Sequence, residues 1–382
     1  ISSGEYESTN SDENAILVSG DITSSLSNIT VTKKGDSTSA DGSSFYGNNS
    51  AVLAKSGATL TLDNINVTTS SNGANGVFSY GGSATTNNSN SDGTNVTISN
   101  SKITTTGDNA GGIMTTGGGK TTANNLTINT SGTSSAAIRS DRGGGTVTVN
   151  KGTYTTTGTG SPSIYSTADI TVNNATLVSK ASEGIVIEGK NKVTINNTKL
   201  TDSNTKLNGQ STTYKNIFLY QSMSGDASTG TAEFTSKDSD IVTNNGDTFY
   251  VTNTTATINL TNNKITNNDS KGNFLRVQKD SWGNSGSNGG DVTLNMTNQE
   301  ADDDIVIDSI STLTMNLKEK SSFTGKINSE NSAKSIKLVL DKNSKIKLTG
   351  DSYISSLEDE DSSYDNIDFN GYKLYVNGTA IN

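Results

Sequence analysis

Short runs of alternating apolar and polar residues follow one another along almost the whole chain. In NVTISNSKITT (95–105), Val96 and Ile98 alternate with polar residues, and Ile103 begins a second run after a polar break. Side chains on a β-strand point alternately to its two faces, so each run predicts a short strand with one apolar face. The same two-strand unit recurs in TLTLDNINVTT (59–69), DITVNNATLVS (169–179), KVTINNTKLTD (192–202) and TINLTNNKITN (257–267).

An asparagine occupies the same place in the turn of every copy. The last apolar residue of the first strand always lies five positions before the first apolar residue of the second, as Ile98 lies before Ile103. Asn tolerates the left-handed backbone region and bonds locally, so it suits a sharp two-residue bend. Stacked bends are expected to form an internal ladder of these side chains, which are Asn64, Asn100, Asn174, Asn197 and Asn262.

A third apolar run follows each pair of strands, for example GVFSY (76–80) and GGIMTT (111–116). Self-similarity at a period of about 20–50 residues is the signature of stacked repeats. An antiparallel sandwich would also show short alternating strands, but it would not need three strands per repeat with a fixed Asn bend. The sequence therefore predicts an all-β fold, a single right-handed parallel β-helix of about twelve coils of three strands. Loop insertions are expected after the third strand, as at 81–95.

The composition fits a thin core that is repeated many times. Hydrophobic residues make up only 29% of the 382 residues, and the chain holds 39 glycines and one proline. Such a low apolar content approaches that of disordered chains, but this chain is rich in Thr, Val and Ile, which favour strands. One domain is predicted over 1–382, with an N-terminal cap region at 1–25, coils at 26–334, and the last coils with a C-terminal cap at 335–382.

Several kinds of chemistry are excluded by the residues that the chain lacks. Without Cys there is no disulfide or thiol chemistry, and without His there is no Ser-His-Asp triad. The formal net charge of -10 argues against a nucleic-acid partner, because phosphate binding needs clusters of Lys and Arg. No apolar run is long enough to predict a membrane span. A monomer is expected.

The closing segment carries a resemblance to a known class of proteins. SKIKLTGDSYISSL followed by NIDFNGYKLYVNG is similar to the C-terminal ends of large secreted bacterial β-helix proteins. These Thr/Asn/Gly-rich proteins are described as adhesin-like or autotransporter-passenger-like, with a pectate-lyase-type solenoid. The resemblance implies an extracellular location, either secreted or attached to the cell surface, and contact with a glycan or a host-surface molecule.

The third strands predict one unusual column of side chains. If Ile113 points inward, its neighbour Met114 points outward, and the same register assigns every other third strand. The outward residues are then Leu53, Phe78, Met114, Arg139, Tyr165, Val186, Phe218, Tyr250 and Arg276. Four of these nine are Phe or Tyr in a chain with only 5% aromatic residues, so chance is a poor explanation.

Two interpretations of this column compete. It is either an exposed binding face, because aromatic rings stack on sugar rings, or a second small core that the insertions fold back to cover. For the first interpretation, the candidate ligand-binding residues are Phe78, Met114, Arg139, Tyr165, Phe218, Tyr250, Arg276 and Trp282.

An enzyme is the alternative to a binding protein, since this fold also hosts polysaccharide lyases and hydrolases. Arg139, Asp141 and Arg142 in IRSDRGGG are the residues that a lyase site would use, but a charge pair capping a loop is favoured. Asp302, Asp303 and Asp304 are a weak candidate for Ca²⁺, without the spacing of a recognisable calcium loop.

The sequence therefore predicts a non-enzymatic adhesin-like protein with no catalytic residues and no cofactor. Polysaccharide lyase or hydrolase activity is the second hypothesis, for which clustered, partly buried carboxylates on neighbouring coils would speak. A rigid structural spacer is the third, for which a polar and loop-covered surface would speak.

Overall fold

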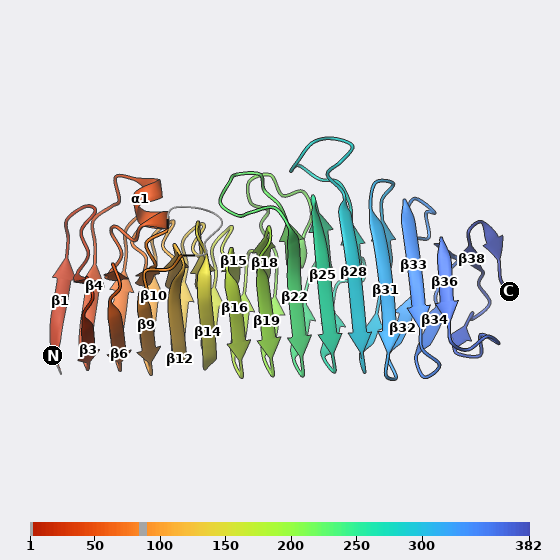
Figure 1. Ribbon diagram of the computed structural model, residues 1–382, viewed down its shortest axis with the longest axis horizontal. Helices are drawn as coiled ribbons and strands as arrows, with labels where there is room; N and C mark the ends of the chain where they lie inside the picture. Colours follow the sequence, from red (N-terminus) through yellow and green to blue (C-terminus); the bar gives the residue numbers. More distant parts are fainter. Residues whose placement is uncertain (1–2, 84–89) are drawn as a thin grey trace.

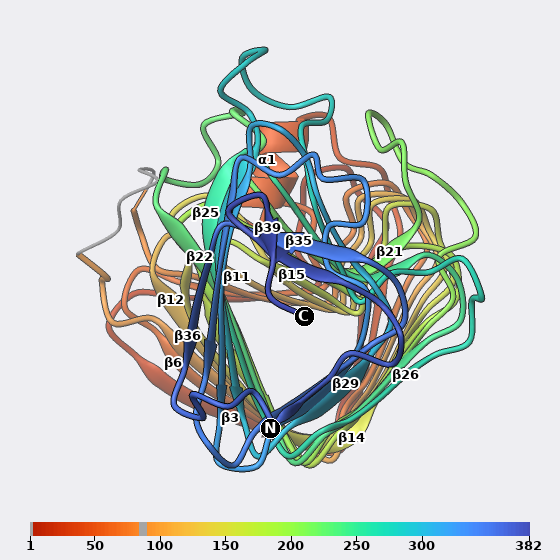
Figure 2. The ribbon, with the colours of Figure 1, turned by 90° about the vertical axis from the view of Figure 1, so that its right-hand side faces the viewer.

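Strands of successive coils stack in parallel, each on its equivalent in the next coil, and build an elongated solenoid with the two termini at opposite ends (Figure 1). The structure is a computed structural model that describes residues 3–83 and 90–382. Seen end-on, the strands surround a triangular interior on three sides (Figure 2). The predicted parallel β-helix is confirmed.

The first and second strands of most coils belong to one large sheet that is folded at the bends between them. Its strands are β1 (Gly4–Ser8), β3 (Thr23–Ser27), β4 (Ile29–Lys33), β6 (Thr59–Asp63), β7 (Asn66–Thr69), β9 (Asn95–Ser99), β10 (Lys102–Thr105), β12 (Gly119–Thr130), β14 (Gly145–Thr156), β16 (Asp169–Asn173), β17 (Thr176–Ser179), β19 (Lys192–Asn196), β20 (Lys199–Asp202), β22 (Thr231–Lys237), β23 (Asp240–Thr243), β25 (Thr254–Thr261), β26 (Lys264–Asn267), β28 (Gly290–Thr297), β31 (Thr312–Lys318), β33 (Ser335–Leu340) and β36 (Ser356–Asp359).

The third strands form a separate sheet, which we call the third-strand sheet. It consists of β2 (Ile16–Ser19), β5 (Val52–Lys55), β8 (Val77–Tyr80), β11 (Ile113–Thr116), β13 (Ile138–Ser140), β15 (Ile164–Ser166), β18 (Ile185–Glu188), β21 (Lys215–Tyr220), β24 (Asp247–Thr252), β27 (Leu275–Val277) and β30 (Ile305–Ile307). Two small sheets complete the C-terminal end, one of β29 (Glu300–Asp302), β32 (Ser322–Gly325), β34 (Lys345–Leu348) and β37 (Ile367–Asp368), the other of β35 (Ser352–Ile354), β38 (Leu374–Val376) and β39 (Thr379–Ala380).

The bends between first and second strands have the predicted left-handed backbone. Asn64, Asn100, Asn174, Asn197 and Asn262 have φ between 44° and 56°. Asn197 donates from Nδ2 to Asn174 Oδ1 at 2.7 Å, whereas Asn100 and Asn262 donate to aspartates of the neighbouring bends. The ladder is exposed, however, so the expectation of an internal ladder is wrong.

The apolar core runs along the axis of the solenoid. It is lined by the inward residues of all three strands, and those of the third strands include Val77, Ile113, Ile138 and Ile217, each at most 1% exposed. A thin cross-section repeated in every coil explains how a chain with so few hydrophobic residues buries a continuous core.

The long loops leave the coil at both ends of the third strand. The insertions after it include 221–230 and 278–289, as predicted, while the predicted insertion at 81–95 lies partly outside the described residues; the segments 34–51 and 203–214 precede it. Insertions after the third strand are therefore confirmed, and those before it are an addition that the sequence did not predict. Short bends line one edge of the solenoid and long loops line the opposite edge (Figure 1).

The ends of the solenoid are built from strands as well. Within the predicted N-terminal cap region, β1 and β2 already pair with β4 and β5. At the C-terminal end, β38 and β39 form an antiparallel pair. The one helix among the described residues, α1 (Ala40–Phe45), begins after Ser39, whose side chain accepts a hydrogen bond from Gly42 N. No helix of the described part of the chain is long and apolar enough to cross a membrane.

Candidate functional site

The strand register aligns the outward residues of the third strands in one column. Met114 pairs with Phe78 on one side and Arg139 on the other, and Phe218 pairs with Val186 and Tyr250. Strands β2 to β30 continue this register without a break. The period-2 alternation of the sequence therefore predicted the alignment of these side chains.

The N-terminal part of the column is covered by the loop 34–51. Leu53, Phe78 and Met114 form a buried apolar cluster, against which Tyr80 packs. Gly47 lies so close that a Cβ there would meet Leu53 Cδ1 at 2.5 Å, and its φ is +78°. Only glycine fits such a position, because L-residues rarely adopt this backbone conformation.

The C-terminal part of the column is covered by the loop 278–289. Phe218 stacks on Tyr220 with ring centroids 4.3 Å apart, and the ring of Trp282 lies 5.4 Å from that of Phe218. Tyr250 is fully buried, and its hydroxyl donates to the carboxylate of Asp280 in the covering loop. These rings form a second small core outside the helix.

The aromatic column is therefore not an open binding face. Phe78, Met114 and Tyr250 are 0% exposed and Phe218 is 3% exposed. These side chains are buried as the alternative interpretation expected, with the insertions folded back over the column. Burying each large apolar side chain stabilises the protein by about 1.5–3 kcal/mol, which accounts for the outward aromatic residues without a ligand.

Arg139 of the column and the nearby Arg142 are held in ion pairs. Arg139 donates to Asp141 at 3.0 Å, and Arg142 donates to Asp226 of the loop 221–230 at 2.8 Å while its guanidinium lies 4.2 Å from the centroid of the Phe45 ring. Burial raises the pKa of Asp141 to about 6, against the opposing effect of Arg139. These contacts fit the predicted charge pair that caps a loop.

Arg276 and Glu188 are also engaged. Arg276 Nε donates to Asp247 at 2.8 Å. Glu188 is 2% exposed and accepts from the hydroxyls of Tyr165 and Ser222. Burial raises the pKa of Glu188, while its hydrogen bonds oppose the shift. Each of these groups fixes a strand or a loop.

The acidic run at 302–304 does not converge. Asp302 is exposed. The carboxylate of Asp304 accepts a hydrogen bond from the backbone N–H of Lys326, and the ammonium group of Lys326 lies 3.9 Å from it. Burial and the charges of Asp302 and Asp304 raise the pKa of Asp303. In the described residues no group of three Asp or Glu side chains is placed to hold a metal ion.

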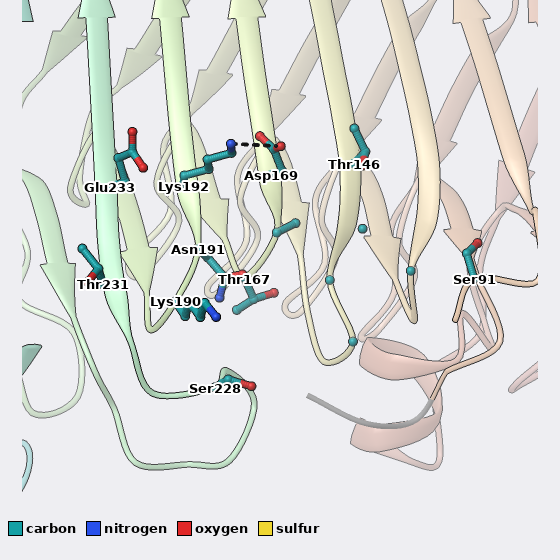
Figure 3. Close-up of a pocket in the computed structure, with 15 residues that line it drawn as sticks. Ser91, Thr146, Thr167, Asp169, Lys190, Asn191, Lys192, Ser228, Thr231 and Glu233 are labelled. Carbon is teal, nitrogen blue, oxygen red and sulfur yellow. Dashed lines mark ion pairs between the residues drawn. The ribbon is translucent and has the colours of Figure 1, made fainter. Parts of the chain in front are cut away.

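A wide hollow lies elsewhere, where the third strands lead into β14, β16, β19 and β22. This polar groove encloses about 1020 Å³. Its lining side chains include Thr146, Asp169, Lys192 and Glu233 on neighbouring strands (Figure 3). Ser91 lies on one side of the groove, while Ser228 comes from the loop 221–230. The groove therefore spans several coils.

Glycines, which have no side chains, form the floor of the groove. A Cβ at Gly145 would lie 2.2 Å from the carbonyl oxygen of Gly119, and Gly143 and Gly144 both have positive φ. Lys192 pairs with Asp169 at 3.4 Å, so the charged side chains of the lining, Lys190 and Lys192 against Asp169 and Glu233, balance. The groove is polar, neutral in sum and open.

Sequence reasoning missed this groove. Its residues come from turns and strand starts of separate coils, so no single motif marks it. The triple glycine at 143–145 was the available signal, because a run of glycines indicates close approach of backbone to backbone or to a ligand. Comparison of the chain with protein-family models, with curated proteins and with solved structures finds no match.

Proposed function

We propose that the protein is a non-enzymatic, adhesin-like β-helix of bacterial origin, secreted or attached to the cell surface, that binds a glycan through the polar groove. The observation that carries the proposal is the groove itself, an open hollow of about 1020 Å³ with hydroxyl, amide, carboxylate and ammonium groups on neighbouring coils. Such groups hydrogen-bond the hydroxyls of a sugar, and charges that balance favour a neutral ligand.

The spacing of the coils suits an extended polymer. Asp169, Lys192 and Glu233 pair in register on three adjacent parallel strands. Parallel strands lie about 4.8 Å apart, which is close to the advance of one sugar residue in an extended polysaccharide. Successive coils therefore offer a polar group at each step to successive sugars.

A glycan array with matched variants tests this proposal. Lys192→Ala removes an ammonium group from the groove, whereas Lys199→Ala removes an exposed lysine that starts β20, the next strand of the same coil but not part of the groove lining. We expect Lys192→Ala to weaken binding about tenfold or more, the loss of one charge-assisted hydrogen bond, and Lys199→Ala to leave it unchanged. Binding that is equal in both variants would place the ligand outside the groove.

The rigid spacer is the second candidate. The loop-covered third-strand sheet favours it, because few large apolar side chains of the described residues remain exposed, among them Leu17 and Met223. A wild-type protein that binds nothing on the array yet stays a stiff rod by small-angle scattering would support the spacer.

Lyase or hydrolase activity is a weaker candidate. Asp141 and Glu188 are buried carboxylates with raised pKa values, but both are engaged by neighbouring side chains. Incubation with uronic-acid polymers, followed by absorbance of unsaturated products and by a reducing-sugar assay, tests it. Product formation that Asp141→Asn abolishes would overturn the non-enzymatic proposal.

A further inference from the structure

Buried hydroxyl residues at the ends of several second strands donate to the backbone of the corner that leads to the third strand. Thr105 donates from its hydroxyl to Ala110 O at 2.7 Å, Thr130 to Ser135 O at 2.6 Å, and Ser179 to Glu183 O at 2.9 Å. Each thus satisfies the backbone at the corner that leads to the third strand. The next residue of this column is Asp202, which pairs with Ser179 in register and cannot donate when ionised.

Four acceptor oxygens at this corner have no hydrogen-bond donor among the described residues. They are both carboxylate oxygens of Asp202 and the amide oxygens of Asn204 and Asn216. The three residues are at most 1% exposed. A buried polar atom without a partner costs about 1–3 kcal/mol, so four together demand a physical reason.

Contacts gather these side chains around one corner. Asn216 donates to Thr243 Oγ1 at 3.0 Å, and Thr243 pairs with Asp202 in register. Asn204 donates to the carbonyl oxygen of Lys215, the residue before Asn216. Gly184 leaves room for the amide of Asn216, since a Cβ there would lie 2.2 Å from its Oδ1.

Asp202 is the uncompensated charge of this corner. The facing Lys215 pairs with Glu183 at 3.4 Å and also lies over the rings of Phe218 and Tyr250. Glu183 and Lys215 therefore cancel, and the carboxylate of Asp202 remains. Burial raises its pKa well above the ordinary value, with Glu183 adding to the shift and Lys215 opposing it.

We propose that Asp202, Asn204 and Asn216 bind a monovalent cation, Na⁺ or K⁺, at this corner. Oxygen atoms are the ligands that hard cations take. One carboxylate among neutral amides balances a single positive charge, whereas Ca²⁺ sites use more carboxylates. The cation supplies the positive partner that all four oxygens lack.

The cation joins the two ends of a loop. Asn204 precedes and Asn216 follows the segment 205–215. This segment also contacts the loop 278–289, which covers the aromatic column. Thr212 donates to Asp280 at 3.0 Å, and Ser281 donates to Gln210 O at 2.8 Å. Ion binding therefore stabilises the loops over Phe218 and Tyr250, independently of any glycan in the groove.

Thermal unfolding of the full chain in different chloride salts tests this site. At equal ionic strength and fixed pH, NaCl or KCl is expected to raise the Tm saturably, by about 2 °C or more, over tetramethylammonium chloride, whose cation is too large to enter. Asp202→Asn and Asp202→Thr are expected to lose this difference. The variant Asp21→Asn, at an exposed aspartate outside both the groove and this corner, is expected to keep it.

Two results with the wild type and the Asp202 variants would overturn the proposal. One is a wild-type Tm that is equal in all three salts and rises only on acidification, which would assign a proton rather than a metal ion to Asp202. The other is an ion-specific rise that survives in both Asp202 variants. As a gain of function, Asn204→Asp adds a second carboxylate and is expected to introduce a Ca²⁺-dependent rise; a variant that responds to every ion as wild type does would also contradict the site.

Discussion

Replacing Phe218 by alanine separates a covered column from an open one. Phe218 is 3% exposed, and its ring contacts those of Tyr220, Tyr250 and Trp282 at centroid distances of 4.3, 5.7 and 5.4 Å. Removing a buried phenylalanine costs about 3–5 kcal/mol. On an exposed sheet face the same change would alter the free energy of unfolding by no more than about 0.5 kcal/mol. The two interpretations therefore predict severalfold different losses of stability.

Trp282 provides the assay, because it is the only tryptophan of the chain and packs on Phe218. Its emission reports the covering loop, while far-UV circular dichroism reports the solenoid. For Phe218→Ala we expect red-shifted emission in the native state. We also expect the free energy of unfolding, measured with urea, to fall by about 3–5 kcal/mol. Thr194→Ala, on a first strand far from the cover, is the control. Wild-type emission and stability in Phe218→Ala would refute the second core.

Three further predictions address the bends, the buried carboxylate and the groove floor. Asn100 has φ 51°, so Asn100→Ala is expected to lower the free energy of unfolding by about 1–2 kcal/mol, whereas Asn100→Gly costs less because glycine tolerates this backbone; chemical denaturation compares the two. The pKa of Asp141 is raised from its ordinary 3.8 to about 6, so its stabilising contribution is full below 3.8 and is lost as pH rises through 6. Between pH 4 and 7 the wild type should lose up to about 3 kcal/mol relative to Asp141→Asn, and parallel stability curves would contradict the shift. Gly145→Ala is expected to distort the groove, since its Cβ would meet Gly119 O at 2.2 Å, and to reduce both Tm and glycan binding; unchanged values of both would show that the floor tolerates a side chain.

The sequence predicted the side-chain directions because they follow from a local rule. Alternation along a strand depends only on neighbouring residues, so Ile113 and Met114 could be assigned to opposite faces without knowing the rest of the fold. The bends were equally local, since Asn100 adopts a backbone region that few other residues tolerate.

The exposure of those side chains could not be predicted in the same way. Met114 is buried because the loop 34–51, far away in the sequence, folds over it, and sequence gives the length of a loop but not its path. The ladder direction was misjudged for a related reason. Ile65, next to Asn64, is 2% exposed and takes the inward position at the bend, which leaves the asparagine outside.

The candidate site depended most on distant contacts. The polar groove joins residues of several coils, and the corner at Asp202 becomes unusual only when its neighbours in the stack, Ser179 and Thr243, are seen to be hydroxyls. A buried aspartate in the second strand of KVTINNTKLTD looks like an ordinary strand end in the sequence.

Methionine oxidation tests the central claim, that loops cover the outward column, most directly. The chain has four methionines: Met296 and Met315 lie in the axial core at 0% exposure, Met223 is 60% exposed, and Met114 belongs to the column. With dilute peroxide and peptide mass spectrometry of the native protein, we predict that Met223 is oxidised first and that Met114 reacts as slowly as Met296 and Met315. Oxidation of Met114 at the rate of Met223 would show an open column and would contradict the account.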